Sequence, residues 1–135
     1  MLKKILIIYF DEKKVHQIAE GIKDGAEKNG YKVEMMSTAH KGKIVTFHPY
    51  DLVIAGGPTR GIFRGKVPSA ISRFLKNCKR TAGQEAVAFV TPRFFATTKA
   101  LRNLMGHLEA QGCIVNDFKN FKSYNEAVSY GENLE

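Results

Sequence analysis

The chain has 135 residues, of which 44% are hydrophobic and 25% are charged, and its formal net charge is +8. This length suits one globular domain, which we expect to span residues 1–135, and is too short for two. No apolar run reaches the roughly 20 residues needed to cross a bilayer, so the sequence argues against a membrane-spanning protein.

The first expected element is a buried strand over residues 2–10. Its continuous, Ile-rich apolar run is typical of a parallel sheet that is covered on both faces. The run is too short for the apolar part of a secretory signal peptide, so we expect a cytoplasmic protein. Apolar residues then recur at helical spacing and predict a helix over residues 12–29, which ends at Asn29 and Gly30.

The middle of the chain predicts two more strands and a second helix. Residues 31–36 indicate a short strand, and the polar residues 37–49 indicate a connection. Residues 50–58 predict a third strand, which is stopped by a Gly-Gly-Pro sequence. A loop over residues 59–66 follows, and Pro68 lies where proline is tolerated, in the first turn of a helix.

The last part of the chain continues the alternation. Residues 86–90 predict a fourth strand, and leucines at 3–4 spacing predict a helix over residues 97–111, which is capped by Gly112. Residues 113–121 indicate a fifth strand. The sequence Ser-Tyr-Asn-Glu at residues 123–126 is a capping box that predicts a short final helix.

Alternating strands and helices predict an α/β fold with right-handed crossovers between parallel strands. We expect a three-layer α/β/α sandwich around a five-stranded parallel sheet. Five strands at this length favour the order 2-1-3-4-5 over a six-stranded dinucleotide-binding sheet. Ligands of such sheets bind at the carboxyl ends of the strands, so the loops there are the candidate site.

The chain resembles the flavodoxin-like family over essentially all 135 residues. The resemblance rests on KILIIYF before IAEGI, on YDLVIAGGPTRG before VPSAISRFL, and on ALRNLMGHLEAQGCIV. It implies a short-chain flavodoxin or flavodoxin domain protein, a flavoprotein that binds FMN in electron transfer or as an oxidoreductase. In the family two loops border the flavin ring. The matching positions here are Pro58, Thr59, Arg60 and Gly61 after the third strand, and Pro92, Arg93, Phe94 and Phe95 after the fourth.

The third family element, the phosphate-binding loop, is degenerate in this sequence. Its positions match residues 10–15, which contain neither a hydroxyl side chain nor a glycine. A carboxylate at about 4 Å from a phosphate costs about 4 kcal/mol at a near-surface dielectric. We expect Asp11 to cap the helix in place of the phosphate. In the alternative, Lys13 and Lys14 turn inward and rebuild a weaker phosphate site. The resemblance therefore implies FMN that is bound weakly or not at all.

Charge is unevenly distributed along the chain. Between residues 52 and 108, ten Lys and Arg residues accompany a single acid, Glu85. Such a field favours a flavin or another anionic ligand, or an acidic redox-partner protein. Phe63, Phe94 and Phe95 belong to the ligand loops and predict an aromatic, cationic rim. In the alternative, Phe94 or Phe95 packs under its own loop and the arginines are solvated. No RNA-binding motif or helix-turn-helix is present, so nucleic acid is not an expected partner.

No sequence pattern indicates a catalytic or metal site. Cys78 and Cys113 form no CxxC pair and are expected to be reduced, buried thiols. The four histidines lack metal-ligand spacing. Two functions remain open: a flavin redox protein with a compromised phosphate site, and a non-flavin module that binds an acidic partner protein through its basic surface.

Overall fold

The protein contains one five-stranded parallel sheet, flanked by helices on both faces. The structure, a computed structural model, describes residues 3–42 and 44–135. The strands are β1 (Lys4–Tyr9), β2 (Lys32–Ser37), β3 (Leu52–Pro58), β4 (Glu85–Thr91) and β5 (Ile114–Asn120). Their order in the sheet is β2-β1-β3-β4-β5, which confirms the predicted order.

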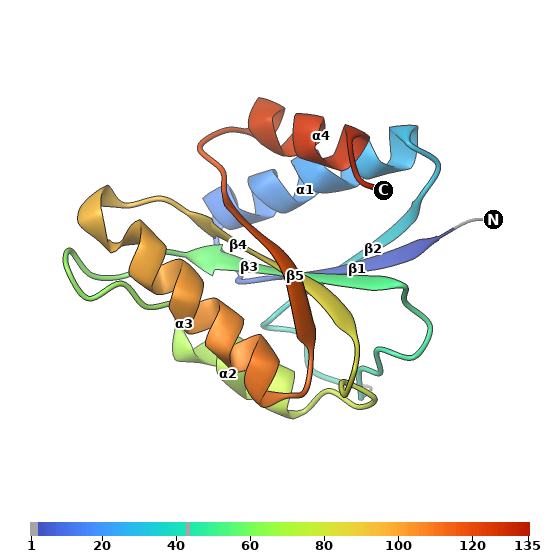
Figure 1. Cartoon of the computed structure of the whole chain (residues 1–135), viewed down its shortest axis with the longest axis horizontal. Helices are drawn as coiled ribbons and strands as arrows, with labels where there is room; N and C mark the ends of the chain where they lie inside the picture. Colours follow the sequence, from blue (N-terminus) through green and yellow to red (C-terminus); the bar gives the residue numbers. More distant parts are fainter. Residues whose placement is uncertain (1–2, 43) are drawn as a thin grey trace.

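Helices form the two outer layers of the sandwich (Figure 1). The helices α1 (Lys13–Lys28) and α4 (Tyr124–Glu132) lie on one face of the sheet. The helices α2 (Ser69–Lys76) and α3 (Thr97–Ala110) lie on the other face. A short 3-10 turn, η1 (Phe94–Ala96), precedes α3 and was not expected from the sequence. The three-layer α/β/α arrangement is therefore confirmed.

The burial of β1 on both faces explains why its residues are apolar at successive positions. Leu6 and Ile8 contribute to the core under α2 and α3, whereas Ile5 and Ile7 contribute to the core under α1 and α4. All four side chains are buried, because adjacent residues of a strand point to opposite faces and helices cover both faces. This double burial places β1 in the interior of the sheet, with the carboxyl end of the strand at the edge where α1 begins.

The predicted helix ends are confirmed. Gly30 follows the C-cap of α1 with a φ of +89°, and Gly112 follows the C-cap of α3 with a φ of +85°. Ser123 caps α4 by accepting a hydrogen bond from the Glu126 N–H at 3.2 Å. A capping box predicts that the Glu126 carboxylate accepts from the N–H of the N-cap residue. It accepts instead from the N–H of Lys122, one residue before the N-cap, at 3.0 Å.

Both cysteines are buried and free, as predicted. Burial raises the pKa of the Cys78 thiol to about 12 and that of Cys113 to about 11, so both are neutral thiols near neutral pH. Within residues 3–42 and 44–135, no helix is long and apolar enough to cross a membrane. The same residues contain no cluster of His, Cys, Asp and Glu that could hold a metal ion.

Candidate functional site

The loop that follows β3 is a closed, ordered turn. The Arg60 N–H donates to the Lys66 carbonyl at 2.8 Å, and the Lys66 N–H donates back to the Arg60 carbonyl at 3.1 Å. Gly61 has a φ of +86°, a conformation that glycine adopts without steric cost. The loop carries Phe63 at its tip, where the side chain is 66% exposed. Two backbone bonds thus hold an apolar ring in solvent at the carboxyl end of β3.

The loop that follows β4 presents two more exposed rings. The Arg93 N–H donates to the Thr97 Oγ1 at 2.9 Å, which ties the loop to the start of α3. Phe94 has a φ of +45°, in the left-handed region that bulky residues rarely adopt. Phe94 is 81% exposed and Phe95 is 79% exposed. The alternative that these phenylalanines pack under their own loop is therefore wrong.

Four contacts fix the loop after β3 against the loop after β4 and α3. The Thr59 N–H and the Thr59 hydroxyl both donate to the Thr91 carbonyl, at 3.2 Å and 2.7 Å. The Val67 N–H donates to the Asn103 Oδ1 at 3.0 Å. Gly65 is buried so tightly that a Cβ built on it would lie 1.8 Å from the Ala96 carbonyl oxygen. The loops after β3 and β4 therefore form one surface, and the Thr59 hydroxyl is already bonded within it.

The central feature of this surface is a pair of parallel rings. The rings of Phe63 and Phe95 have centroids 6.2 Å apart and planes that differ by 3°. A planar ring held face to face between two others, with carbon contacts of about 3.5 Å on each side, needs a centroid separation of about 7 Å. Both side chains lie on exposed loops, so a small outward movement of either ring would admit a planar ligand. The pair thus offers apolar ring surface that is exposed to solvent.

Two arginines lie close in sequence to the aromatic pair, on the same loops. Arg64 follows Phe63, and Arg93 lies two residues before Phe95. Both arginines are exposed, and neither forms an ion pair with any residue that the structure describes. Free guanidinium groups on loops that also carry exposed aromatic rings favour planar, electron-rich or anionic ligands. Of the other predicted residues, Pro58 is buried at the end of β3 and Pro92 is half-buried after β4.

The start of α1 differs from the expectation. The N-cap is Glu12, not Asp11, and no side chain caps the helix among the described residues. The Glu12 N–H donates to the Phe10 carbonyl at 2.8 Å. This bond closes a tight turn over residues 10–12, and the helix begins only after it. Asp11 is consequently an exposed residue outside the helix. The expected Asp11 cap is wrong because this local turn moves the helix start to the next residue.

Glu12 has a partner that lies far away in the sequence. Its carboxylate Oε2 is 3.0 Å from the Arg60 Nη2, so the turn after β1 is joined to the loop after β3. The Arg60 guanidinium carbon also lies 5.6 Å from the centroid of the Phe10 ring. Burial, followed by the charges of Asp11 and Glu20, raises the pKa of Tyr9 at the end of β1. Acidic groups thus lie at the start of α1, one of them paired with Arg60.

The two lysines at the start of α1 extend from the helix into solvent. Lys13 and Lys14 are exposed, and neither forms an ion pair or a side-chain hydrogen bond within the described residues. The turn before them has no hydroxyl group, which is the usual side-chain donor at such sites, and no glycine. The alternative in which both lysines turn inward finds no support in their exposure.

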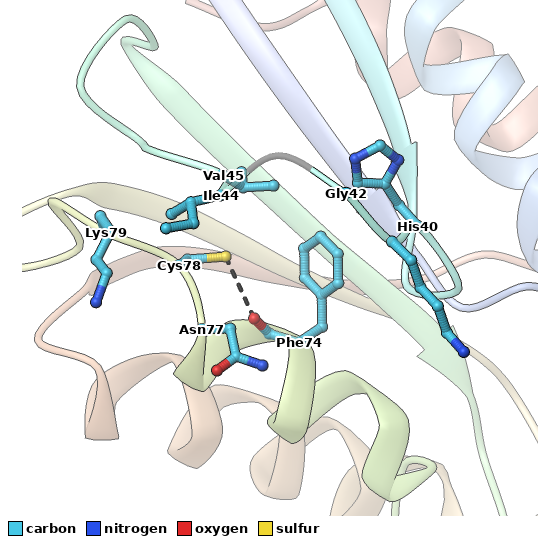
Figure 2. Close-up of a pocket in the computed structure, with 9 residues that line it drawn as sticks. His40, Gly42, Ile44, Val45, Phe74, Asn77, Cys78 and Lys79 are labelled. Carbon is cyan, nitrogen blue, oxygen red and sulfur yellow. Dashed lines mark hydrogen bonds between the residues drawn. The ribbon is translucent and has the colours of Figure 1, made fainter.

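A separate cavity of about 400 Å³ lies at the far end of α2, away from the aromatic pair. It opens between the connection that precedes β3 and the residues that follow α2, and Figure 2 shows the Phe74 ring pointing into it. The Cys78 Sγ donates to the Phe74 carbonyl at 3.4 Å, so this thiol is bonded to the backbone (Figure 2). The cavity lies far from the carboxyl edge of the sheet, where ligands of such folds bind.

The sequence predicted most residues of this surface but not the contacts that join its loops. Phe63 could be recognised because an aromatic residue in a Gly- and Arg-rich loop cannot join a helix stripe. The pairing of Glu12 with Arg60 could not, because 48 residues separate the two and no local pattern links them. Gly65 gave only the general signal of a glycine in a loop, since the need for it comes from the backbone of a later helix.

The FMN that the sequence implies has a planar ring and a phosphate, and the residues present fit these two parts differently. The exposed parallel phenylalanines and their flanking arginines fit the ring. The start of α1 does not fit the phosphate, because the turn before it carries two acids, Asp11 and Glu12, and lacks the hydroxyls and glycine that hold a dianion at a helix start. The nearest arginine, Arg60, is already paired with the Glu12 carboxylate.

The fold is similar to those of solved flavodoxins along almost the whole chain. The two-electron reduced flavodoxin of Megasphaera elsdenii has a TM-score of 0.76 at 14% identity, over 95% of this chain and 96% of that chain. The oxidised Flavodoxin 1 of Bacillus cereus has a TM-score of 0.72 at 16% identity, over 98% and 100% of the two chains.

A longer protein contains the same fold as one part. The Flv1 flavodiiron core of Synechocystis sp. PCC6803 has a TM-score of 0.67 at 19% identity, over 96% of this chain and 33% of that chain. Neither the protein-family models nor the curated proteins give a match to the sequence. At such identities the likeness shows the fold alone, and the chain has a flavodoxin-like α/β fold.

Proposed function

We infer that this protein binds a flavin through its ring and takes part in flavin electron transfer, with a compromised site for the FMN phosphate. The observation that carries this proposal is the parallel, exposed pair of Phe63 and Phe95, at the end of the sheet where α/β folds bind ligands. Isolated apolar side chains on a surface are ordinary, but two parallel rings from two loops tied together are a stacking site.

Different residues would contact different parts of the flavin. Phe63 and Phe95 would stack on the ring, while Arg64 and Arg93 would lie at its border and favour negative charge there. The closed loop after β3, with its bond from Thr59 to Thr91, would keep the two faces in register. The bound flavin would supply the electron chemistry, and the chain would supply orientation and electrostatics.

The test is a titration of the purified protein with FMN, followed by quenching of flavin fluorescence and by thermal unfolding. We expect quenching, and a rise in Tm when ligand exceeds Kd. Stacking of a ring on an aromatic side chain contributes about 1–3 kcal/mol, so Phe63→Ala or Phe95→Ala should weaken binding about 5- to 100-fold. The matched control is Phe118→Ala, because Phe118 is 54% exposed on β5 and belongs to neither loop. Absence of any Tm shift at millimolar FMN would refute the proposal.

A second candidate function uses the same surface differently. Phe94 is the most exposed of the three rings and stacks on no other ring among the described residues, while its neighbour Arg93 is unpaired there. An apolar group rimmed by cations is typical of a surface that binds a protein with acidic residues. On this alternative, the module binds an acidic partner protein and no flavin. Charge reversal by Arg64→Glu with Arg93→Glu should then abolish capture of the partner at low salt, and retained capture would reject this function.

A further inference from the structure

The ion pair between Glu12 and Arg60 joins two segments that each border the proposed flavin site. Glu12 is the N-cap of α1, and Arg60 begins the loop that carries Phe63. The Glu12 side chain is 34% exposed and the Arg60 side chain is 50% exposed, so the pair is partly shielded but remains within reach of solvent. The Phe10 ring under the guanidinium favours the position that Arg60 adopts.

This pair takes up the arginine that reaches the start of α1, and the turn there carries two acids, Asp11 and Glu12. The start of a helix attracts anions through its free amides and its dipole, and an arginine binds phosphate through two parallel hydrogen bonds. Here a carboxylate of the chain itself lies at the start of α1, and the arginine is bonded to that carboxylate at 3.0 Å. A phosphate would have to displace Glu12 from Arg60 and would then face two acids, Asp11 and Glu12.

The ring surface does not share this conflict. Phe63, Phe95 and the flanking Arg64 and Arg93 make no contact with Glu12 among the interactions of the described residues. Binding of a neutral planar ligand between the two phenylalanines therefore leaves the ion pair intact. A phosphate on the ligand would therefore be disfavoured at the Glu12–Arg60 pair, whereas the ring would bind between the phenylalanines with or without it.

We propose that the Glu12–Arg60 pair determines the ligand class of this site, which is an isoalloxazine that carries no phosphate. The inference rests on the proposed flavin function and sharpens it. Glu12 is a specificity-determining residue, because its carboxylate takes the place of a phosphate on Arg60 and repels a second anion. The phosphate of FMN then adds nothing to the affinity that the ring and its sugar-alcohol chain provide.

The test compares two probes, riboflavin and FMN, which differ by the phosphate alone. Each is titrated against the wild-type protein at ~0.15 M and ~0.5 M salt, because added salt screens general attraction by the basic surface. We expect the two Kd values to agree within about threefold at the higher salt. FMN bound tenfold or more tightly than riboflavin by the wild-type protein would overturn the inference and leave the flavin function standing. Binding of neither probe would overturn both.

Substitution of the acid supplies the second arm. Glu12→Gln should tighten FMN binding about tenfold or more, because Arg60 gains a free charge-assisted bond, and should leave riboflavin unchanged. The matched control is Glu27→Gln, which removes an exposed carboxylate near the other end of the same helix. Arg60→Gln provides an independent readout in the opposite direction, since the unpaired Glu12 should weaken FMN relative to riboflavin. An unchanged ratio of the two affinities in both Glu12→Gln and Arg60→Gln would overturn the inference.

Discussion

Substitution of Gly65 tests whether the two ring-bearing loops form one rigid surface. A Cβ at Gly65 would lie 1.8 Å from the Ala96 carbonyl oxygen and 2.6 Å from the Ala100 nitrogen. Real Cβ atoms essentially never come within 3.0 Å of such atoms, so the loop after β3 must move outward by at least the difference of 1.2 Å. The groups it meets are backbone atoms at the start of α3, and they cannot rotate away as a side chain can.

The expected cost of Gly65→Ala follows from this overlap. Overpacking of a closely fitted site costs about 1–3 kcal/mol of unfolding free energy. For a domain of this size, each kcal/mol lowers Tm by about 3–6 °C, so the variant should melt roughly 3–18 °C lower. Because Phe63 is carried on the same loop, the outward movement should also separate it from Phe95 and weaken flavin binding.

Thermal and urea unfolding followed by circular dichroism measures the first effect, and flavin titration measures the second. The matched control is Gly106→Ala in the exposed face of α3, where an added Cβ meets no atom within 4 Å. That change should stabilise the protein by up to about 1 kcal/mol, because alanine favours a helix interior over glycine. If Gly65→Ala were as stable as Gly106→Ala, the close approach of the two loops would be refuted.

Two further predictions concern buried titratable groups. Because burial raises the pKa of Cys78 to about 12 and that of Cys113 to about 11, both thiols should resist Ellman's reagent at pH 8 until urea unfolds the protein, and a fast reaction of the native protein would contradict this. Burial, with Lys76 adding to it, lowers the pKa of His107 below 6.5, so the unfolded state binds the proton first as pH falls. Stability should therefore decline as pH drops below about 6.5, and His107→Gln should remove this part of the decline in urea unfolding at pH 5.5 and 7.5; an equal decline in both proteins would disprove it.

The sequence was sufficient for the architecture because the relevant signals are local. The apolar run of β1 indicated double burial, since a strand with helices on both faces needs apolar residues at successive positions. Glycines after the helices predicted where α1 and α3 end, because those positions require positive φ. The alternation of elements at this length then left one probable sheet order among the common doubly wound folds, which the structure has.

The sequence also identified which loops hold the candidate site, because strand ends are readable and parallel strands place their carboxyl ends together. It could not identify the stacking partner of Phe63 or the need for Gly65, since each depends on a residue of the next loop or helix. The helix cap was misplaced by one residue, because Asp11 and Glu12 are both acceptable there and a backbone bond at Phe10 decided between them.

What the sequence determined by itself, therefore, is the order of elements, the sheet, and the absence of hydroxyl groups and glycine from the turn before α1. Only the tertiary structure decided what the acids of that turn contact. Folding brings Arg60 to within 3.0 Å of Glu12 across 48 residues of chain, and an ion pair that forms only between distant segments leaves no pattern in either segment. The acids at the start of α1 are consequently half of an internal contact, beside an aromatic surface that is open to a ligand.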